Sequence, residues 1–415
     1  MTTPKLALIP CGYKASRVYS ILPTDGTGDF DFTRSGNATR VNSEGLIEVV
    51  STNVPRLNYS LIDGVVSGCP SLLLEFERTN LVAYSEDFSN AYWTKSGSSV
   101  VSGFVSPDGT ANAFKLVEDS ATSRHTITMA NTPVSVANHS ASIFVKANGR
   151  TKIALSEEVA TGLYASFDLT TGTVLSESGI SSKIEALADD WYRISYTSLS
   201  GTFFLLRVCL LPDSYTTGAV TGTYTGDGTS GVYIWGAQLE QGSYATSYIP
   251  TQGATATRVA ETCNGAGNSQ IFNDSEGVLY WEGSTSKADG TYRIINLGNG
   301  VNPEFGASLR FDYPVGSNSL SALFYNGAGF TAVISFTLTD ITTVNKIAFR
   351  YKTNDFGLFV NGVKVGSGLS GATGGVSISE LSFNNGVTNN FTGETKTLQV
   401  LPTQTDAQLI TLTTL

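Results

Sequence analysis

The polar and apolar residues of this chain alternate in many short runs. The clearest run is 231–239, whose two alternating sets are Val232, Ile234 and Gly236 against Tyr233, Trp235 and Ala237. Such alternation is typical of β-strands, because successive side chains of a strand point to opposite faces of its sheet. The runs recur about every 8–12 residues with Gly-, Asn- and Asp-rich turns between them, as sandwiches require. The pattern therefore predicts an all-β protein.

The runs fall into two groups, with a turn-rich stretch before the first group and a glycine-rich stretch between them. We predict two jelly-roll β-sandwich domains in tandem, preceded by a turn-rich N-terminal β segment. The expected divisions are an attachment and oligomerisation segment, a first sandwich, a linker and a second sandwich, at 1–83, 84–251, 252–270 and 271–415. One short helix is expected at 405–410, after an N-cap at Thr403 or Thr405.

The surface of the protein must be poor in charge, because Asp, Glu, Lys and Arg make up only 14% of the chain. Soluble domains usually carry about 25%, so Ser, Thr, Asn and Gly must supply much of the polar surface. The formal net charge is −10, and no dense run of Lys or Arg is present. This composition argues against a nucleic-acid partner. No apolar run approaches the ~20 residues of a membrane span, and the N-terminus does not resemble a signal peptide.

The four cysteines, Cys11, Cys69, Cys209 and Cys263, have spacings that fit neither a zinc site nor a C-x-x-C motif. A bridge between Cys11 and Cys69 stays an open alternative to free thiols. The low number of cysteines fits assembly in a reducing cytosol.

Several phrases of the sequence resemble structural proteins of tailed bacteriophages. The stretches 88–93, 191–193 and 236–240 resemble carbohydrate-binding-module-like jelly rolls of phage fibre and head proteins. The stretch 346–365, with its Asn361-Gly362 hairpin signal, resembles the late strands of concanavalin A-like lectin/glucanase (laminin-G-like) jelly rolls.

The resemblance implies a non-enzymatic virion structural protein exposed on the particle, as a head fibre, capsid decoration or tail fibre/spike subunit. Its partners would be phage capsid or tail proteins, further copies of itself in a homotrimer, and host-surface glycans. Such a protein would be assembled in the host cytoplasm and displayed on the particle surface. The alternative is a host-polysaccharide depolymerase or glycosidase of a phage tail spike.

Aromatic side chains are the candidates for glycan binding, because glycan sites commonly combine aromatic faces with nearby polar groups. The candidates in the first sandwich are Trp93, Trp235, Tyr233, Tyr244 and Tyr248. The alternative stays open that the tryptophans belong to the core and the tyrosines to a domain interface. Carbohydrate-binding modules also often hold a structural Ca²⁺ on oxygen ligands. Glu86, Asp87 and Glu240, at the two ends of this domain, are the candidate ligands.

No catalytic arrangement emerges from the sequence. Only two histidines are present, and no G-x-S-x-G elbow accompanies them. Glu75 and Glu77 are two residues apart, so they would point to the same face of a strand, as the catalytic acids of a lectin-like glucanase do. A third carboxylate is missing, however, and the pair lies outside both predicted sandwiches. We therefore interpret these glutamates as a structural pair with Arg78 or Arg56, and predict no catalytic residue.

Overall fold

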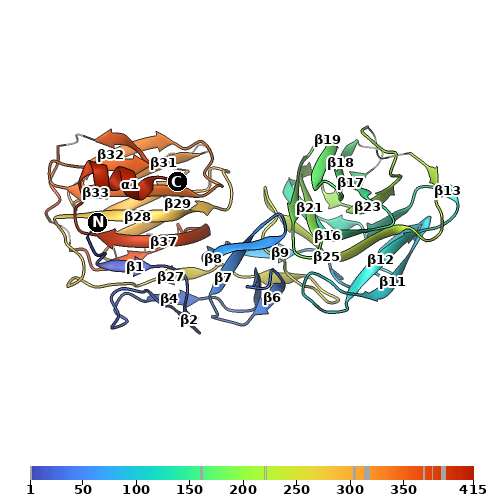
Figure 1. Cartoon of the computed structure of the whole chain (residues 1–415), viewed down its shortest axis with the longest axis horizontal. Helices are drawn as coiled ribbons and strands as arrows, with labels where there is room; N and C mark the ends of the chain where they lie inside the picture. The colour runs from blue at the N-terminus through green and yellow to red at the C-terminus, as the bar shows by residue number, and fades with distance from the viewer. Residues whose placement is uncertain are drawn as a thin grey trace.

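The computed structural model describes residues 2–158, 162–218, 220, 222–301, 305–312, 318–367, 370–375, 377–384 and 389–415. Two β-sandwiches form two lobes, and strands of the N-terminal segment connect them along one side (Figure 1). The all-β prediction is confirmed. The helix found in the described residues is α1 (Asp406–Thr413), which begins after the predicted cap, since the Thr405 side chain and Gln408 form a capping box.

The first sandwich consists of two antiparallel six-stranded sheets. One sheet has the order β10 (Trp93–Ser96), β14 (Thr126–Met129), β23 (Arg207–Leu211), β17 (Lys152–Glu158), β18 (Leu163–Asp168) and β19 (Thr173–Ser178). The other has the order β11 (Ser98–Phe104), β12 (Ala113–Glu118), β25 (Gly231–Gln241), β16 (Ala137–Asn148), β21 (Tyr192–Ser200) and β20 (Ser181–Ala186). Two small ladders complete it: β13 (Thr122–Ser123) with β24 (Tyr224–Thr225), and β15 (Thr132–Pro133) with β22 (Phe203–Phe204).

Strand β25 follows the predicted alternation only as far as Trp235. Val232 and Ile234 point into the sandwich core, but Ala237 and Leu239 do so as well. The pairing of β25 with β16 shifts register between Ser142 and Phe144, and Gly236 there has φ +62°. A bulge of this kind moves the following side chains to the other face, so the prediction that Ala237 shares the face of Trp235 is wrong.

The second sandwich faces a large sheet against a smaller one. The large sheet has the order β35 (Val363–Ser367), β34 (Gly357–Val360), β33 (Asn345–Lys352), β28 (Glu276–Thr285), β37 (Gly393–Leu401), β8 (Val65–Leu74) and β7 (Arg56–Ile62), with β1 (Leu6–Leu8) also paired to β37. The smaller sheet has the order β32 (Phe330–Thr337), β31 (Ser319–Tyr325), β30 (Gly306–Phe311), β29 (Arg293–Gly298) and β36 (Glu380–Ser382).

The N-terminal segment thus contributes strands to the sandwich at the opposite end of the chain. Strand β1 pairs with β37 through Leu6 and Val400, and β8 pairs with the same strand through Leu74 and Gly393. Leu6 and Leu74 are fully buried in the core of the second sandwich. The segment packs within its own chain, and a role in attachment or oligomerisation stays a prediction.

A layer of short strands connects the two sandwiches. Strand β4 (Phe30–Thr33) pairs with β3 (Arg17–Val18) and β27 (Thr262–Asn264), and β3 pairs with β2 (Tyr13–Lys14). Strand β9 (Arg78–Asn80) pairs with β26 (Ala256–Arg258), and β5 (Ala38–Val41) forms a hairpin with β6 (Ile47–Val50). The stretch 252–270, predicted as a linker, therefore contains two strands that are hydrogen-bonded to the N-terminal segment.

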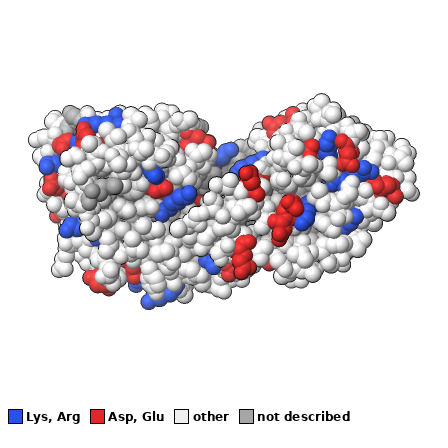
Figure 2. Space-filling model, in the orientation of Figure 1, with Lys and Arg blue, Asp and Glu red and all other residues white. Residues whose placement is uncertain are grey.

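The surface matches the low charge of the sequence, since small scattered groups of charged residues interrupt a mostly uncharged face (Figure 2). All four cysteines are free thiols, so Cys11 and Cys69 are not bridged in this structure. No helix among the described residues is long and apolar enough to cross a membrane.

Candidate functional site

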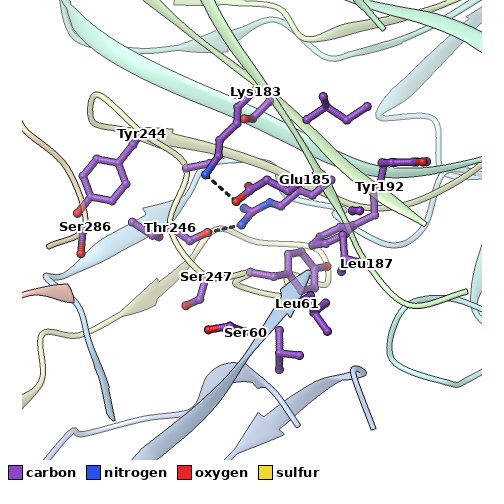
Figure 3. A pocket seen from close by; sticks show the side chains of 18 of the residues that line it. Ser60, Leu61, Lys183, Glu185, Leu187, Tyr192, Tyr244, Thr246, Ser247 and Ser286 are labelled. Atoms are coloured by element: carbon purple, nitrogen blue, oxygen red, sulfur yellow. Dashed lines mark hydrogen bonds and ion pairs between the residues drawn. The ribbon is translucent and has the colours of Figure 1, made fainter. Parts of the chain in front are cut away.

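A groove with a volume of about 920 Å³ opens where the first sandwich meets the connecting layer. Its walls come from the edge strand β20 and its neighbour β21, from β5 and β7, from the stretch 243–248, and from a loop of the second sandwich. Figure 3 shows Lys183, Glu185 and Tyr192 on the side of the first sandwich, Tyr244 and Ser286 opposite, and Ser60 and Leu61 below. Four parts of the chain that are distant in sequence therefore build one site.

The strand wall of the groove carries Arg193, which fixes the opposite wall. Its guanidinium donates to the backbone oxygen of Thr246 at 2.7 Å and to the Ser142 hydroxyl at 2.9 Å. The same group lies 5.3 Å from the centroid of the Phe144 ring, close enough for a cation–π contact. On the outer part of this wall Lys183 pairs with Glu185 at 2.7 Å. Arg193 thus attaches the stretch 243–248 to the sheet.

Glu240 holds the same stretch from beneath. Its carboxylate accepts from the Thr246 backbone N–H at 2.7 Å, from the Thr246 hydroxyl at 2.7 Å and from the Gln238 amide at 2.7 Å. The side chain is fully buried. A buried carboxylate is tolerable when such donors satisfy its oxygens, so Glu240 shapes the groove rather than facing it.

A second carboxylate of the groove, Glu394 of β37, contacts Asn58 of β7. Asn58 donates its amide to Glu394 at 2.8 Å and accepts from the Val41 backbone N–H at 2.8 Å. Burial raises the pKa of Glu394, and the hydrogen bond from Asn58 opposes this rise only in part. The charge of Glu394 is therefore disfavoured in the folded protein.

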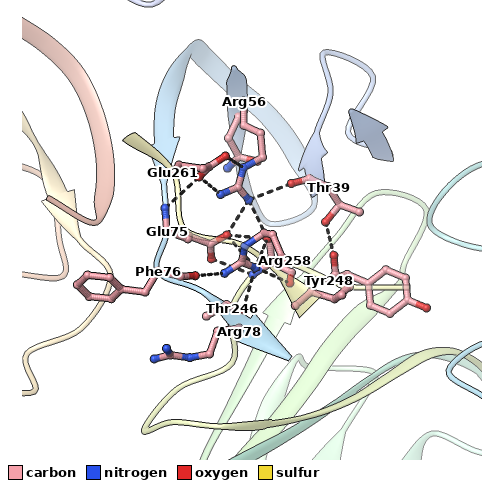
Figure 4. Close-up of polar contacts among 12 residues, drawn as sticks. Thr39, Arg56, Glu75, Phe76, Arg78, Thr246, Tyr248, Arg258 and Glu261 are labelled. Atoms are coloured by element: carbon pink, nitrogen blue, oxygen red, sulfur yellow. Dashed lines mark hydrogen bonds and ion pairs between the residues drawn. The ribbon is translucent and has the colours of Figure 1, made fainter. Parts of the chain in front are cut away.

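Beneath the groove lies a buried cluster of five charged residues: Arg34, Arg56, Glu75, Arg258 and Glu261. We refer to these five residues as the junction cluster. Figure 4 shows four of them, Arg56, Glu75, Arg258 and Glu261. Arg56 pairs with Glu75 at 2.6 Å and also with Glu261, Arg34 pairs with Glu261 at 2.8 Å, and Arg258 pairs with Glu75 at 3.2 Å. Of the two predicted partners, Arg78 and Arg56, the structure pairs Glu75 with Arg56.

The junction cluster is stabilised by partners beyond its ion pairs. Arg34 also donates to the backbone oxygens of Gly36 and Val54, and Arg258 donates to that of Phe76. Burial alone would raise the pKa of Glu75, but Arg258 and Arg56 hold it far below its usual range. Glu75 therefore stays charged in neutral solution, and the ion pairs of the cluster join the N-terminal segment to the chain that follows the first sandwich.

The two predicted tryptophans lie in the core instead of in the groove. Trp93 and Trp235 each expose only 1% of their surface. The Trp93 indole N–H donates to the backbone oxygen of Tyr84 at 2.9 Å, and Trp235 packs against Tyr248 with ring centroids 4.7 Å apart. Neither indole offers a face to solvent, so these two residues cannot serve as sugar platforms in this structure.

The three predicted tyrosines differ in their positions. Tyr244 and Tyr248 line the groove, whereas Tyr233 does not. Tyr248 exposes only 3% of its surface, and its hydroxyl donates to Glu86 at 2.9 Å. The Tyr233 hydroxyl accepts from the Asn148 amide at 2.8 Å. Tyr244, which is half-buried, is the predicted aromatic residue best placed to contact a ligand.

The predicted calcium ligands are not brought together. Glu86 accepts from the Tyr248 hydroxyl, Asp87 accepts from the Ser89 backbone N–H at 3.1 Å, and Glu240 is used as described above. Over the described ranges, no group of three or more Asp, Glu, His or Cys residues is placed to hold a metal ion. The structure thus gives the Ca²⁺ hypothesis no site at these three residues.

Sequence reasoning missed most of the residues that line the groove. Tyr59, Tyr192 and Lys287 were not among the candidates, although all three line it. They belong to the N-terminal segment, the first sandwich and the second sandwich, in that order. Only the arrangement of the domains brings them together, and no local motif marks them.

Comparison with known proteins finds related folds only. No known protein family matches the chain, and no curated protein matches it. Among solved structures, the chain is similar to the CBM40 of the Ruminococcus gnavus IT-sialidase bound to α2,3-sialyllactose, with 16% identity, 34% of this chain and 83% of that chain covered, and a TM-score of 0.28.

Two further structures have similar scores. Domain 4 of AbnA, a GH43 extracellular arabinanase of Geobacillus stearothermophilus in complex with arabinotriose, is 13% identical over 41% of this chain and 81% of that chain, with a TM-score of 0.28. Domains LG4-5 of the mouse laminin α1 chain are 10% identical over 69% of this chain and 89% of that chain, with a TM-score of 0.22. The strand pairings described above show that the molecule is an all-β protein of sandwich modules.

Proposed function

We propose that this chain is a non-enzymatic, glycan-binding structural protein on the outside of a tailed-phage particle. The observation that carries the binding part is the groove between the first sandwich and the connecting layer. Its volume of about 920 Å³ lies near the upper end of the ~300–1,000 Å³ range of ligand pockets. The groove is thus large enough for an oligosaccharide.

The groove offers the kinds of groups that sugars contact. Hydroxyl side chains predominate among its polar residues, and they include Ser60, Thr171, Ser181, Ser182, Ser195, Thr197, Ser243 and Ser286. A hydroxyl both donates and accepts hydrogen bonds, so it matches the hydroxyl groups of a sugar ring. Tyr59, Tyr192 and Tyr244 add aromatic surface, which can cover the apolar face of a ring.

The carboxylates of the groove support binding without hydrolysis. Glycoside hydrolysis requires two carboxyl groups that flank the bond to be cleaved. Glu75 is held in the junction cluster, Glu185 is paired with Lys183, and Glu394 accepts from Asn58. The fourth acid that lines the groove, Asp63, lies on the turn between β7 and β8. Because the other three carboxylates are engaged, the groove favours a lectin-like role over the alternative of a depolymerase or glycosidase.

The location on a virion is proposed from the phage-like phrases 88–93, 191–193 and 236–240 and from the low-charge surface. We expect the protein to be detected by mass spectrometry in purified particles, and light scattering to give a homotrimer. Absence from particles would contradict the virion role. A stable monomer would contradict the trimer and favour a decoration subunit that docks on the capsid.

The glycan role is tested by measuring the binding of three proteins to a glycan array: the wild-type chain and two variants in which tryptophan replaces an alanine. Ala245 lines the groove, so Ala245→Trp would fill it with an indole. Ala111 is exposed and lies outside the groove, so Ala111→Trp is the matched control. We expect the wild type and the control to bind the same glycans and Ala245→Trp to lose them. Equal binding by all three proteins would place the glycan site elsewhere, and no binding by any of them would overturn the glycan role.

A further inference from the structure

The groove continues into a second hollow of about 510 Å³. The two hollows share four lining residues, Ser181, Thr197, Ser243 and Lys287. The second hollow extends along the same strands, with Ser198 and Leu199 from β21 and Asn138 from β16. The two hollows therefore form one trough along the edge of the first sandwich instead of a closed pocket.

Lys287 lies where the two hollows meet. It belongs to the stretch between β28 and β29, so the second sandwich contributes it to a trough that the first sandwich mainly forms. It is the only charged residue among those that line the second hollow. Within the described part of the chain, no hydrogen bond or ion pair involves its side chain. The nearby Lys183, by contrast, pairs with Glu185.

The acids of the trough leave the ammonium of Lys287 uncompensated. No carboxylate lines the second hollow. In the first hollow, Glu185 and Glu75 are ion-paired, and burial disfavours the charge of Glu394. The fourth acid of the first hollow, Asp63, is exposed to solvent on the turn between β7 and β8, forms no ion pair with Lys287 in the described part of the chain and does not line the second hollow. A half-buried ammonium without a partner favours an anionic ligand, because a charge-assisted hydrogen bond is about twice as strong as a neutral one.

We infer that the trough binds an internal stretch of a linear anionic polysaccharide, with a sugar carboxylate placed at Lys287. This inference rests on the proposed function, since it specifies the ligand of the same site. An open trough accepts a chain that continues at both ends, whereas a closed pocket would select a terminal sugar. Because Lys287 comes from the second sandwich, such a ligand would contact both sandwiches at once.

The test is isothermal titration of the whole chain with size-defined sugar fragments. The anionic probes are alginate, polygalacturonate and hyaluronan fragments, and the neutral probes are xylan and maltodextrin fragments, each with one, two, four, six or eight rings. For at least one anionic series we expect affinity to rise about tenfold or more between two and six rings, which corresponds to about 1.4 kcal/mol. Neutral fragments of equal length should bind more weakly.

Variants of Lys287 test the anionic part separately. Lys287→Glu should weaken binding of the six-ring anionic fragment about tenfold or more, Lys287→Ala should weaken it less, and Lys287→Arg should restore most of the affinity. Lys14→Glu is the matched control, because Lys14 is exposed on β2 and lines neither hollow. Thermal unfolding should be unchanged in all four variants.

The outcomes separate the inference from the proposed function. If one ring binds as tightly as six, the trough does not hold an extended chain, although glycan binding stands. If neutral and anionic fragments bind equally and Lys287→Glu has no effect, the ligand is not anionic. If no fragment binds and the glycan array is also empty, both the inference and the proposed glycan role are overturned.

Discussion

The junction cluster and the groove above it use charge in opposite ways, although they share residues. Glu75 belongs to the cluster and also borders the groove, and Ser247 donates to Glu75 while lining the groove. In the cluster, each guanidinium and carboxylate has a charged partner inside the protein. In the groove, Lys287 has none among the described residues.

Under the proposed function, this difference lets one junction provide both rigidity and binding. Removing a charge from water costs several kcal/mol, which close pairing must offset. Five buried charges are thus stable only in a fixed geometry, and that geometry positions the N-terminal segment against the stretch 243–248. A half-buried lysine costs less to leave unpaired, so the groove can keep a charge free for a ligand.

The largest effect should come from removing the centre of the junction cluster. Arg56→Leu would leave Glu75 and Glu261 short of their main partner, and breaking a buried pair costs about 3–5 kcal/mol. We expect a loss of that size in the free energy of unfolding, measured by denaturant titration of the whole chain. A loss below about 1 kcal/mol would show that the cluster does not stabilise the junction.

Acid should weaken the junction cluster through Glu75. The folded pKa of Glu75 lies well below the unfolded value of about 4.3. Its stabilisation is therefore fully present above the unfolded pKa and is lost as the pH falls toward the folded pKa. We expect the melting temperature of the wild type to lie well above that of Glu75→Gln at pH 7. This difference in melting temperature should narrow steadily below about pH 4. A difference in melting temperature that does not change with pH would contradict a stabilising role for the charge of Glu75.

Glu394 should show the opposite dependence on pH, with a smaller effect. Burial raises its folded pKa above the unfolded value, so its contribution is most favourable in acid and is lost as the pH rises through the folded pKa. Glu394→Gln keeps an oxygen that can accept from Asn58. We expect the melting temperature of this variant to be higher than that of wild type at pH 7 and equal to it near pH 4. A lower melting temperature at pH 7 would contradict the raised pKa.

The smallest effect on stability should come from the ion pair on the rim of the groove. The side chains of Lys183 and Glu185 are 68% and 44% exposed, and such pairs contribute about 0.2–1 kcal/mol. Lys183→Ala should therefore leave the melting temperature nearly unchanged. A loss comparable to that of Arg56→Leu would remove the distinction between the two regions.

Local patterns predicted the parts of the fold that depend on neighbouring residues. The alternation of β25 identified a strand, and the capping threonine identified the start of α1, because both signals lie within one element. The bulge at Gly236 was not predictable from alternation alone, since it depends on how β25 pairs with β16. As a result, the alternation predicted the side of the sheet correctly up to Trp235 and wrongly for Ala237.

The site depended on contacts that no local pattern encodes. The Glu75–Arg56 pair was predictable because two opposite charges flank one hairpin, β7–β8. The buried state of Trp93 and the position of Lys287 in the groove follow instead from how the sandwiches pack. The pairing of β1 with β37 joins the two ends of the chain, and the sequence held no signal for it.

The most direct test of the proposed glycan site in the groove is a crystal structure of the whole chain with a six-ring fragment that binds in titration. We predict sugar density along β20 and β21, with Tyr192 and Tyr244 in contact with rings and a carboxylate at Lys287. Sugar density on another face of either sandwich, with the groove empty, would contradict the account.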